Sequence, residues 1–261
     1  MDQELLNKVV QGVRDELNKT TPTTSSDCPI NCATSITEFV GTAIGDTIGL
    51  VIANVDHELH EKMGIDPKYR SIGIIGARVG AGPHIMAVDE AVKATNTEVL
   101  SIELPRDTKG GAGHGSLIII GSDDVSDARR GVEVALATLD QTFGDVYSNE
   151  AGHLEFQYTA RASYAINKAF GAPLGKSFGL ICAGPAAIGV VLADTAVKAA
   201  NVEVVSYSSP SNGTSYSNEV ILTVTGDSGA VRQAVSAARE VGLNLLGSLG
   251  EQAVSTTKPY I

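Results

Sequence analysis

Two stretches of the sequence are near copies of each other: EAVKATNTEVLSIELP at residues 90–105 and TAVKAANVEVVSYSSP at residues 195–210. Nine of the sixteen aligned positions are identical, at a constant offset of 105 residues. Self-similarity at a fixed spacing indicates an internal duplication. The pair therefore predicts two copies of one structural unit, each of about a hundred residues.

The similarity continues on both sides of this pair. The further matches are SIGIIGARVG (71–80) with SFGLICAGPA (177–186), LIIIGSDDVSDARRGVEVA (117–135) with VILTVTGDSGAVRQAVSAA (220–238) and, more weakly, TEFVGTAIG (37–45) with LEFQYTARA (154–162). We therefore expect a first domain at 34–150 and a second domain at 151–261. The segment 1–33 precedes both.

Each unit has the same predicted order of elements: a buried strand, a helix, two strands and a second helix, preceded by further strands. Short apolar segments bounded by glycine suit the buried strands, and apolar residues recur at helical spacing in the helices. Asp124 and Asp227 stand where a helix N-cap belongs, and Asn96 and Asn201 follow the first helix of each unit as stop signals. Two such units in tandem predict an α+β fold.

The segment before Ser25 is organised differently. Leu5, Val9, Val13 and Leu17 fall on one stripe, so residues 2–18 are predicted to form an amphipathic helix. TTPTTSSDCP follows as a flexible linker. Two interpretations stay open: the helix packs on its own domain, or it is a tethered segment that docks on a partner.

Composition excludes several classes of function. The chain has 261 residues and a formal charge of −11, so no positive field would attract nucleic acid. The most apolar stretch, residues 39–55, is interrupted by Asp46 and does not reach the length of a membrane span. The N-terminus lacks the basic start and apolar run of a signal peptide, so we expect a cytoplasmic protein.

Candidates for catalysis are few. HELHE places His57 and His60 three residues apart instead of the four of a zinc-protease helix, and no G-x-S-x-G motif occurs. The glycine-rich segments GARVGAGP (76–83) and KGGAGHG (109–115) match neither a P-loop nor a dinucleotide fingerprint. Surface turns are an equally good interpretation of both segments.

The three cysteines, Cys28, Cys32 and Cys182, form no disulfide framework or paired metal-binding motif. We expect incidental or structural thiols, no bound metal and no cofactor. A weaker alternative is a metal or iron-sulfur centre on Cys182, assembled by several copies around a threefold axis.

The segments AVKAAN, VEVVSY and GDSGAVRQAV resemble the bacterial microcompartment shell domain, and the likeness covers most of residues 71–250. Because strands precede the rest of each unit, the order resembles the circularly permuted tandem shell proteins of the propanediol- and ethanol-utilisation type. The resemblance implies two ferredoxin-like units per chain and a trimer that imitates a hexagon, in which each chain supplies two of six similar wedges.

The resemblance also implies functional residues. Residues at the tile edge would be Lys93, Asn96, Lys198 and Asn201. Residues of the two loops that surround a pore would be Pro105, Arg106, Asp107, Thr108, Lys109, Gly110 and Gly111, and Ser208, Ser209, Pro210, Ser211, Asn212, Gly213, Thr214 and Ser215. Both loops are longer than the short Gly-Ser pore motif of simpler members, which leaves the state of a central channel open.

On this basis we expect a structural shell protein of a microcompartment facet, with no enzymatic activity. Its expected partners are other copies of itself, other shell proteins, encapsulated enzymes reached through the N-terminal helix, and small alcohols or aldehydes in transit. Neither nucleic acid nor a membrane is expected to bind. The alternative is a tandem α+β small-ligand-binding protein or enzyme that uses the glycine-rich loops.

Overall fold

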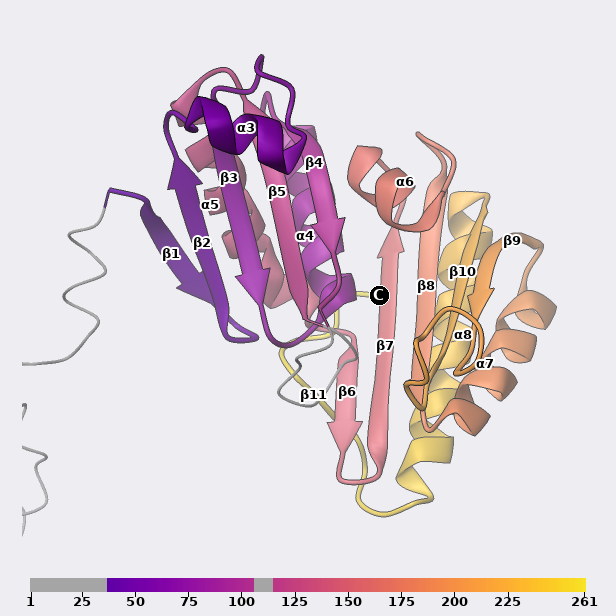
Figure 1. Ribbon diagram of the computed structural model, residues 1–261. Helices are drawn as coiled ribbons and strands as arrows, with labels where there is room; N and C mark the ends of the chain where they lie inside the picture. Colours follow the sequence, from indigo (N-terminus) through magenta and orange to yellow (C-terminus); the bar gives the residue numbers. More distant parts are fainter. Residues whose placement is uncertain (1–36, 106–114) are drawn as a thin grey trace, which may run out of the picture. The chain divides into compact units, whose positions relative to one another are not determined.

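The computed structural model describes residues 37–105 and 115–261, and Thr37–Ile261 forms one compact unit. The predicted helix at 2–18 and its linker lie outside the described residues. No helix within the described ranges combines the length and apolarity that crossing a bilayer requires. Two antiparallel sheets, one from each copy of the repeat, organise this part of the chain (Figure 1).

The first sheet has the strand order β1-β2-β3-β5-β4, and two long helices lie on one of its faces (Figure 1). Its strands are β1 (Phe39–Ala43), β2 (Thr47–Ile52), β3 (Ser71–Ala77), β4 (Glu98–Glu103) and β5 (Ser116–Ser122). Its helices are the short α3 (His57–Met63) and the longer α4 (Ala81–Ala94) and α5 (Val125–Thr142).

The second sheet has the order β11-β6-β7-β8-β10-β9 and also carries two long helices on one face. Its strands are β6 (Val146–Asn149), β7 (Gly152–Thr159), β8 (Ser177–Gly184), β9 (Val202–Ser208), β10 (Val220–Gly226) and β11 (Val254–Ser255). Its helices are the short α6 (Tyr164–Phe170) and the longer α7 (Ala186–Ala199) and α8 (Ser228–Gly247).

The mixed helix and sheet architecture predicted from the repeat is confirmed. Each half runs through strand, helix, two strands and helix, after two preceding strands. The two predicted N-caps form as well: the Asp124 carboxylate accepts a hydrogen bond from Ser126 N, and that of Asp227 accepts from Gly229 N. These contacts satisfy amide groups that the first turn of a helix otherwise leaves unpaired.

The weak match of residues 37–45 with 154–162 is wrong, because it sets a strand of the first sheet against the wrong strand of the second. β7 pairs with β8 as β2 pairs with β3, so β2 and not β1 is the counterpart of β7. The match misled because it joins short segments of low similarity, and a strand's place in a sheet is fixed by pairing. The segment HELHE is at the start of the short helix α3, as an exposed helix end would be, whereas the short helix α6 was not predicted. β6 begins at Val146 and pairs within the second sheet, a few residues before the expected boundary at 150/151.

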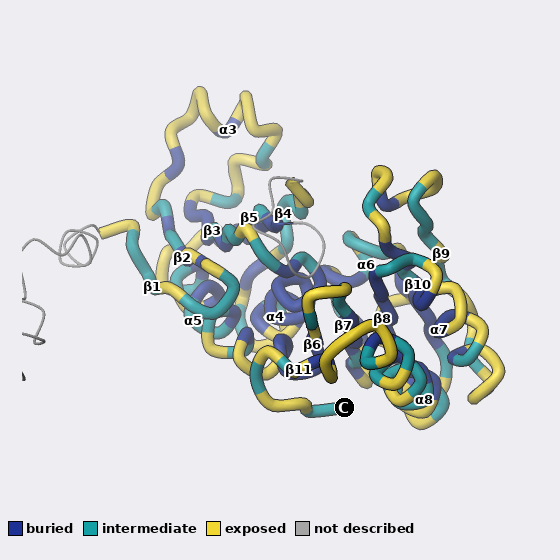
Figure 2. The backbone as a smooth tube through the Cα atoms, turned by 90° about the horizontal axis from the view of Figure 1, so that it is seen from below, coloured by how far each residue is buried: buried dark blue, intermediate teal, exposed yellow. Residues whose placement is uncertain are grey.

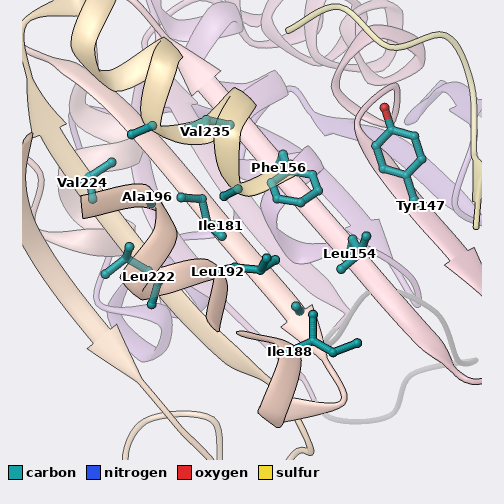
Figure 3. Packing of buried hydrophobic residues seen from close by; sticks show 14 of the residues in the cluster. Tyr147, Leu154, Phe156, Ile181, Ile188, Leu192, Ala196, Leu222, Val224 and Val235 are labelled. Atoms are coloured by element: carbon teal, nitrogen blue, oxygen red, sulfur yellow. The ribbon is translucent and has the colours of Figure 1, made fainter. Parts of the chain in front are cut away.

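The core of the second unit lies between its sheet and helices α7 and α8 (Figure 3). Leu154 and Phe156 of β7 meet Leu192 of α7 and Val235 of α8 there, all fully buried. Gly179 permits this close packing, because a Cβ at that position would lie 2.7 Å from Val235 Cγ2. Truncating a buried aromatic such as Phe156 to alanine typically costs about 3–5 kcal/mol.

A second core joins the two halves. It combines Ile85 and Val88 of α4 with Phe178 and Leu180 on the face of the second sheet opposite α7 and α8. Helix α4 is therefore covered on both sides, and nine of its 14 residues are buried (Figure 2). The corresponding helix of the second unit, α7, has no such cover within the described chain.

Candidate functional site

The first predicted pore loop begins at the end of β4. Pro105 is exposed, and its carbonyl oxygen accepts a hydrogen bond from Gly115 N at 3.0 Å, which closes the base of the loop. The remaining predicted residues of this loop, Arg106, Asp107, Thr108, Lys109, Gly110 and Gly111, lie outside the described residues.

The second predicted pore loop, residues 208–218, folds on itself. Ser209 and Asn212 exchange two backbone hydrogen bonds of 2.7 and 2.9 Å, and the buried Thr214 hydroxyl donates to Ser217 O. Gly213 adopts a φ of 102°, which only glycine reaches without strain. Ser211, Asn212, Gly213 and Ser215 stay exposed, so the loop presents small hydrated groups on an internally bonded frame, next to the Tyr216 ring, which is 83% exposed.

The two predicted edge lysines occupy different environments. Lys93 lies 2.6 Å from Asp89 and 2.7 Å from Glu90, and its ammonium also donates to Thr159 Oγ1 on β7. Its side chain is 25% exposed, against 74% for Lys198, which pairs only with Asp194 among the described residues. Asn96 and Asn201 are both exposed beyond the ends of their helices.

The difference extends along the two helices. Because α4 and α7 each contain 14 residues at the offset of 105, Ile85 corresponds to Val190 and Met86 to Val191. Ile85 and Met86 are buried by the second sheet, whereas Val190 is 51% and Val191 45% exposed. One apolar helix face is thus covered within the chain, and its copy is left uncovered.

Four polar side chains gather on the face of the second sheet that α4 covers. His153 Nε2 lies 3.2 Å from Glu219 Oε2, and Cys182 Sγ lies 3.9 Å from the first atom and 3.7 Å from the second. Glu155 is the cross-strand partner of Cys182. Among the described residues, His153, Cys182 and Glu219 are the group that could hold a metal ion.

Burial sets the protonation of this cluster. Burial, with the neighbouring charge of Glu219, raises the pKa of Glu155 to about 8, so this carboxyl is neutral at physiological pH. Burial also raises the pKa of the Cys182 thiol, with further contributions from Glu219 and Glu155. One oxygen of each glutamate, Oε1, is buried with no hydrogen-bond partner.

The sequence analysis did not select His153, Glu155 or Glu219 as a group. The sequence did contain a signal for this group. Side chains alternate between the two faces of a strand, so GHLEFQYT puts His153, Glu155 and Gln157 on one face of β7, where a buried strand would ordinarily carry apolar residues. Their approach to Cys182 depends on strand register. The motif spacing of the cysteines contains no information about that register.

The other histidines that the structure describes have structural surroundings. His84 on α4 is buried, with Nε2 2.7 Å from Thr47 Oγ1 and its ring edge-on to Phe143. Burial lowers its pKa to about 4. His60 Nε2 lies 2.9 Å from Tyr69 O, and His57 is exposed at the start of α3.

The first glycine-rich segment does not form a phosphate site. It leads into α4, but the N-terminal turn of that helix is occupied: a Cβ at Gly82 would collide with the Glu155 carboxyl group. Phe143 packs against Gly80 in the same region. An anion at a helix N-terminus needs open amide groups and space, and here a side chain from the second sheet fills that space.

Comparison with known proteins agrees with the repeat. The BMC domain family matches residues 71–151 and 177–257. The bacterial microcompartment shell protein PduB of Citrobacter freundii is 63% identical over 258 residues, which cover 99% of this chain and 96% of that protein.

Two crystal structures are also similar. A trimeric bacterial microcompartment shell protein PduB has 57% identity and a TM-score of 0.83, over 87% of this chain and 100% of that one. EtuB from Clostridium kluyveri has 60% identity and a TM-score of 0.84, over 87% and 99%. The chain therefore belongs to the BMC-domain family of bacterial microcompartment shell proteins.

Proposed function

We propose that this chain is a facet tile of a bacterial microcompartment shell, and that it forms closed trimers in which each chain supplies two similar wedges. The observation that carries the proposal is the uncovered face of α7. Val190 and Val191 there correspond to Ile85 and Met86, which the second sheet of the same chain buries. Burial of an aliphatic side chain from full exposure contributes about 1.5–3 kcal/mol, and roughly half of that remains for Val190 and Val191, which are already half buried.

The first sheet offers a matching surface. Its face opposite α4 and α5 carries Ile48, Ile74 and Leu117, none of them fully buried. By strand pairing, Ile74 corresponds to Leu180 and Leu117 to Ile221, two residues that meet α4 within the chain. We infer that α7 of one chain packs on the first sheet of the next, as α4 packs on the second sheet of its own.

Such a contact joins two different surfaces, so it continues from chain to chain until the ring closes. The contact of α4 with the second sheet within a chain resembles the proposed contact of α7 with the first sheet of the next chain. Three chains with two units each would therefore form a ring of six similar units, with the outline of a hexagon. Contacts between neighbouring tiles then involve Lys198 and Asn201, which are exposed, and Asn96. Lys93 contributes less to an edge between tiles, because its ammonium is already paired with Asp89 and Glu90.

The loops at 105–116 and 208–218 are proposed to line the passage for small polar metabolites. Ser211, Asn212 and Ser215 offer hydroxyl and amide groups that replace water around a small alcohol. Flux of propanediol and propionaldehyde across reconstituted shells tests this step. Asn212→Leu should lower the flux of propanediol. Unchanged flux in the loop variants would show that this loop does not line the passage.

The segment 1–33 is proposed to tie the tile to encapsulated enzymes. Its predicted amphipathic helix and linker suit docking on a partner groove. Deleting residues 1–33 should leave trimers intact and separate shell from cargo on co-purification. Co-purification that survives the deletion would contradict this role.

Assembly of the purified chain distinguishes the tile from a ligand-dependent protein. Sedimentation should give trimers, and electron microscopy should then show sheets or tubes, without added nucleotide, cofactor or metal. A stable monomer at high concentration would contradict the proposal. Saturable stabilisation by a nucleotide, with no assembly, would favour the ligand-binding alternative.

A further inference from the structure

We propose that His153, Cys182 and Glu219 form a binding site for one Zn²⁺ ion, with all three ligands from one chain. Their ligand atoms are separated by 3.2, 3.7 and 3.9 Å. Atoms bound to a tetrahedral Zn²⁺ at bond lengths of about 2.0–2.3 Å lie roughly 3.3–3.6 Å apart. An ion therefore fits among the three side chains after shifts of a few tenths of an ångström.

The chemistry of the ligands favours zinc. A thiolate, an imidazole and a carboxylate form a borderline-soft set, whereas Mg²⁺ and Ca²⁺ prefer oxygen ligands alone. The charges of the thiolate and the carboxylate would balance that of a divalent cation, which suits a buried site. Glu155 lies beside the group but outside its ligand atoms, so it is a neighbour and not a ligand.

An ion can enter from solvent. His153 and Glu219 line a surface cleft of about 350 Å³, together with Gly152, Gly184 and Asn218. The His153 side chain is 16% exposed, Glu219 borders the cleft with 2% of its side chain exposed, and Cys182 is buried and does not line the cleft. Three protein ligands leave a fourth tetrahedral position, which a water molecule from the cleft would occupy.

A hydrogen bond between His153 and Glu219 explains only part of this arrangement. It leaves Glu219 Oε1 buried without a partner, and the Cys182 thiol donates to the Glu219 Oε2 atom that already meets His153. The fold does not require the cluster, because the first unit has Gly76 where the second has Cys182 and Gly115 where it has Glu219. A buried carboxylate oxygen without a hydrogen-bond partner calls for an explanation, and a bound ion would supply one for Glu219.

Gly184 is the backbone feature that brings the ligands together. It lies on β8, between His153 on β7 and the start of β10, and a Cβ there would be 2.8 Å from His153 Cε1. Without that Cβ, the imidazole can cross β8 and reach Glu219. An ion at this point would clamp β7, β8 and β10 at the base of the 208–218 loop.

The test uses the full-length chain with Cys28→Ser and Cys32→Ser, so that Cys182 is the remaining thiol. Purified protein is titrated with Co²⁺ as a spectroscopic probe, then with Zn²⁺ in competition. We expect one ion per chain, a thiolate-to-cobalt charge-transfer band, and displacement of that band by Zn²⁺. Sedimentation and circular dichroism check that each protein keeps its assembly and fold.

Cys182→Ser should abolish the charge-transfer band, and His153→Gln should weaken binding on the order of a hundredfold or more. Glu155→Gln is the matched control and should retain the band. A natively assembled Cys28→Ser/Cys32→Ser protein that shows no band would overturn the proposal, as would a band that persists in Cys182→Ser. Should Cys182→Ser fail to fold, the titration of the Cys28→Ser/Cys32→Ser protein decides by itself.

Discussion

Asp89 and Asp194 occupy equivalent positions in helices α4 and α7, yet the Asp89 side chain is fully buried and that of Asp194 is 60% exposed. The Asp89 carboxylate accepts a hydrogen bond from Ser163 N at 2.9 Å, at the start of α6. Lys93 pairs with it from the next turn of α4. The same helix position therefore connects α4 to the start of α6 in the first unit and is exposed to solvent in the second.

Asp89→Ala should destabilise the fold by about 1–3 kcal/mol, because it leaves the Ser163 donors at a buried joint without their acceptor, while Lys93 keeps its pairing with Glu90. Glu90→Ala is the matched control, since Glu90 pairs with the same lysine but is half exposed. A surface pair of that kind contributes about 1 kcal/mol or less. Urea unfolding measures both changes, and equal losses would show that the burial of Asp89 has no special weight.

Val190→Glu should convert trimers to monomers, because it places a charge on the α7 face that is proposed to pack on the next chain. The fold of each chain should survive, since Val190 is half exposed and touches little of its own core. Sedimentation velocity and circular dichroism read the two effects separately. Leu249→Glu, at an equally exposed apolar residue beyond α8, is the control and should stay trimeric.

His84 should make the fold sensitive to acid. Its pKa is about 4 in the folded chain and about 6.5 when unfolded, so the unfolded state binds more protons between these values. Stability is therefore lost as the pH falls from about 6.5 towards 4. His84→Gln should flatten this part of the stability curve, whatever its effect at neutral pH.

His57→Gln, at an exposed histidine of α3, is the control for this pH series. It should leave the slope of the stability curve as it is in the parent chain. Thermal midpoints at a series of pH values measure the slopes. An unchanged slope in His84→Gln would mean that other groups cause the acid sensitivity.

The repeat was sufficient to predict the α+β architecture and the order of the elements from β3 to α5 and from β8 to α8, because duplicated residues such as Asp124 and Asp227 retain the same local role. Burial could not be predicted this way. Ile85 and Val190 look alike in sequence, and their difference arises from which surface reaches each helix. Because the two copies are similar in sequence, the sequence alone does not show that Ile85 is buried and Val190 exposed.

Strand register limited the prediction of sites. The sequence analysis considered Cys182 as a possible metal ligand but assigned it no ligand partners in the same chain, because His153 is 29 and Glu219 is 37 residues away. Only the order β7-β8-β10 brings the three together. The edge and pore residues came from family resemblance, and their roles stay predictions.

The central claim is that α7 of one chain packs on the first sheet of the next. Ile74→Cys and Val190→Cys in one chain, with Cys28→Ser and Cys32→Ser, place a thiol on each side of that joint. Treatment of the assembled protein with a short thiol cross-linker should yield a covalent band of three chains on a denaturing gel. Native trimers that give only single-chain bands would contradict this joint.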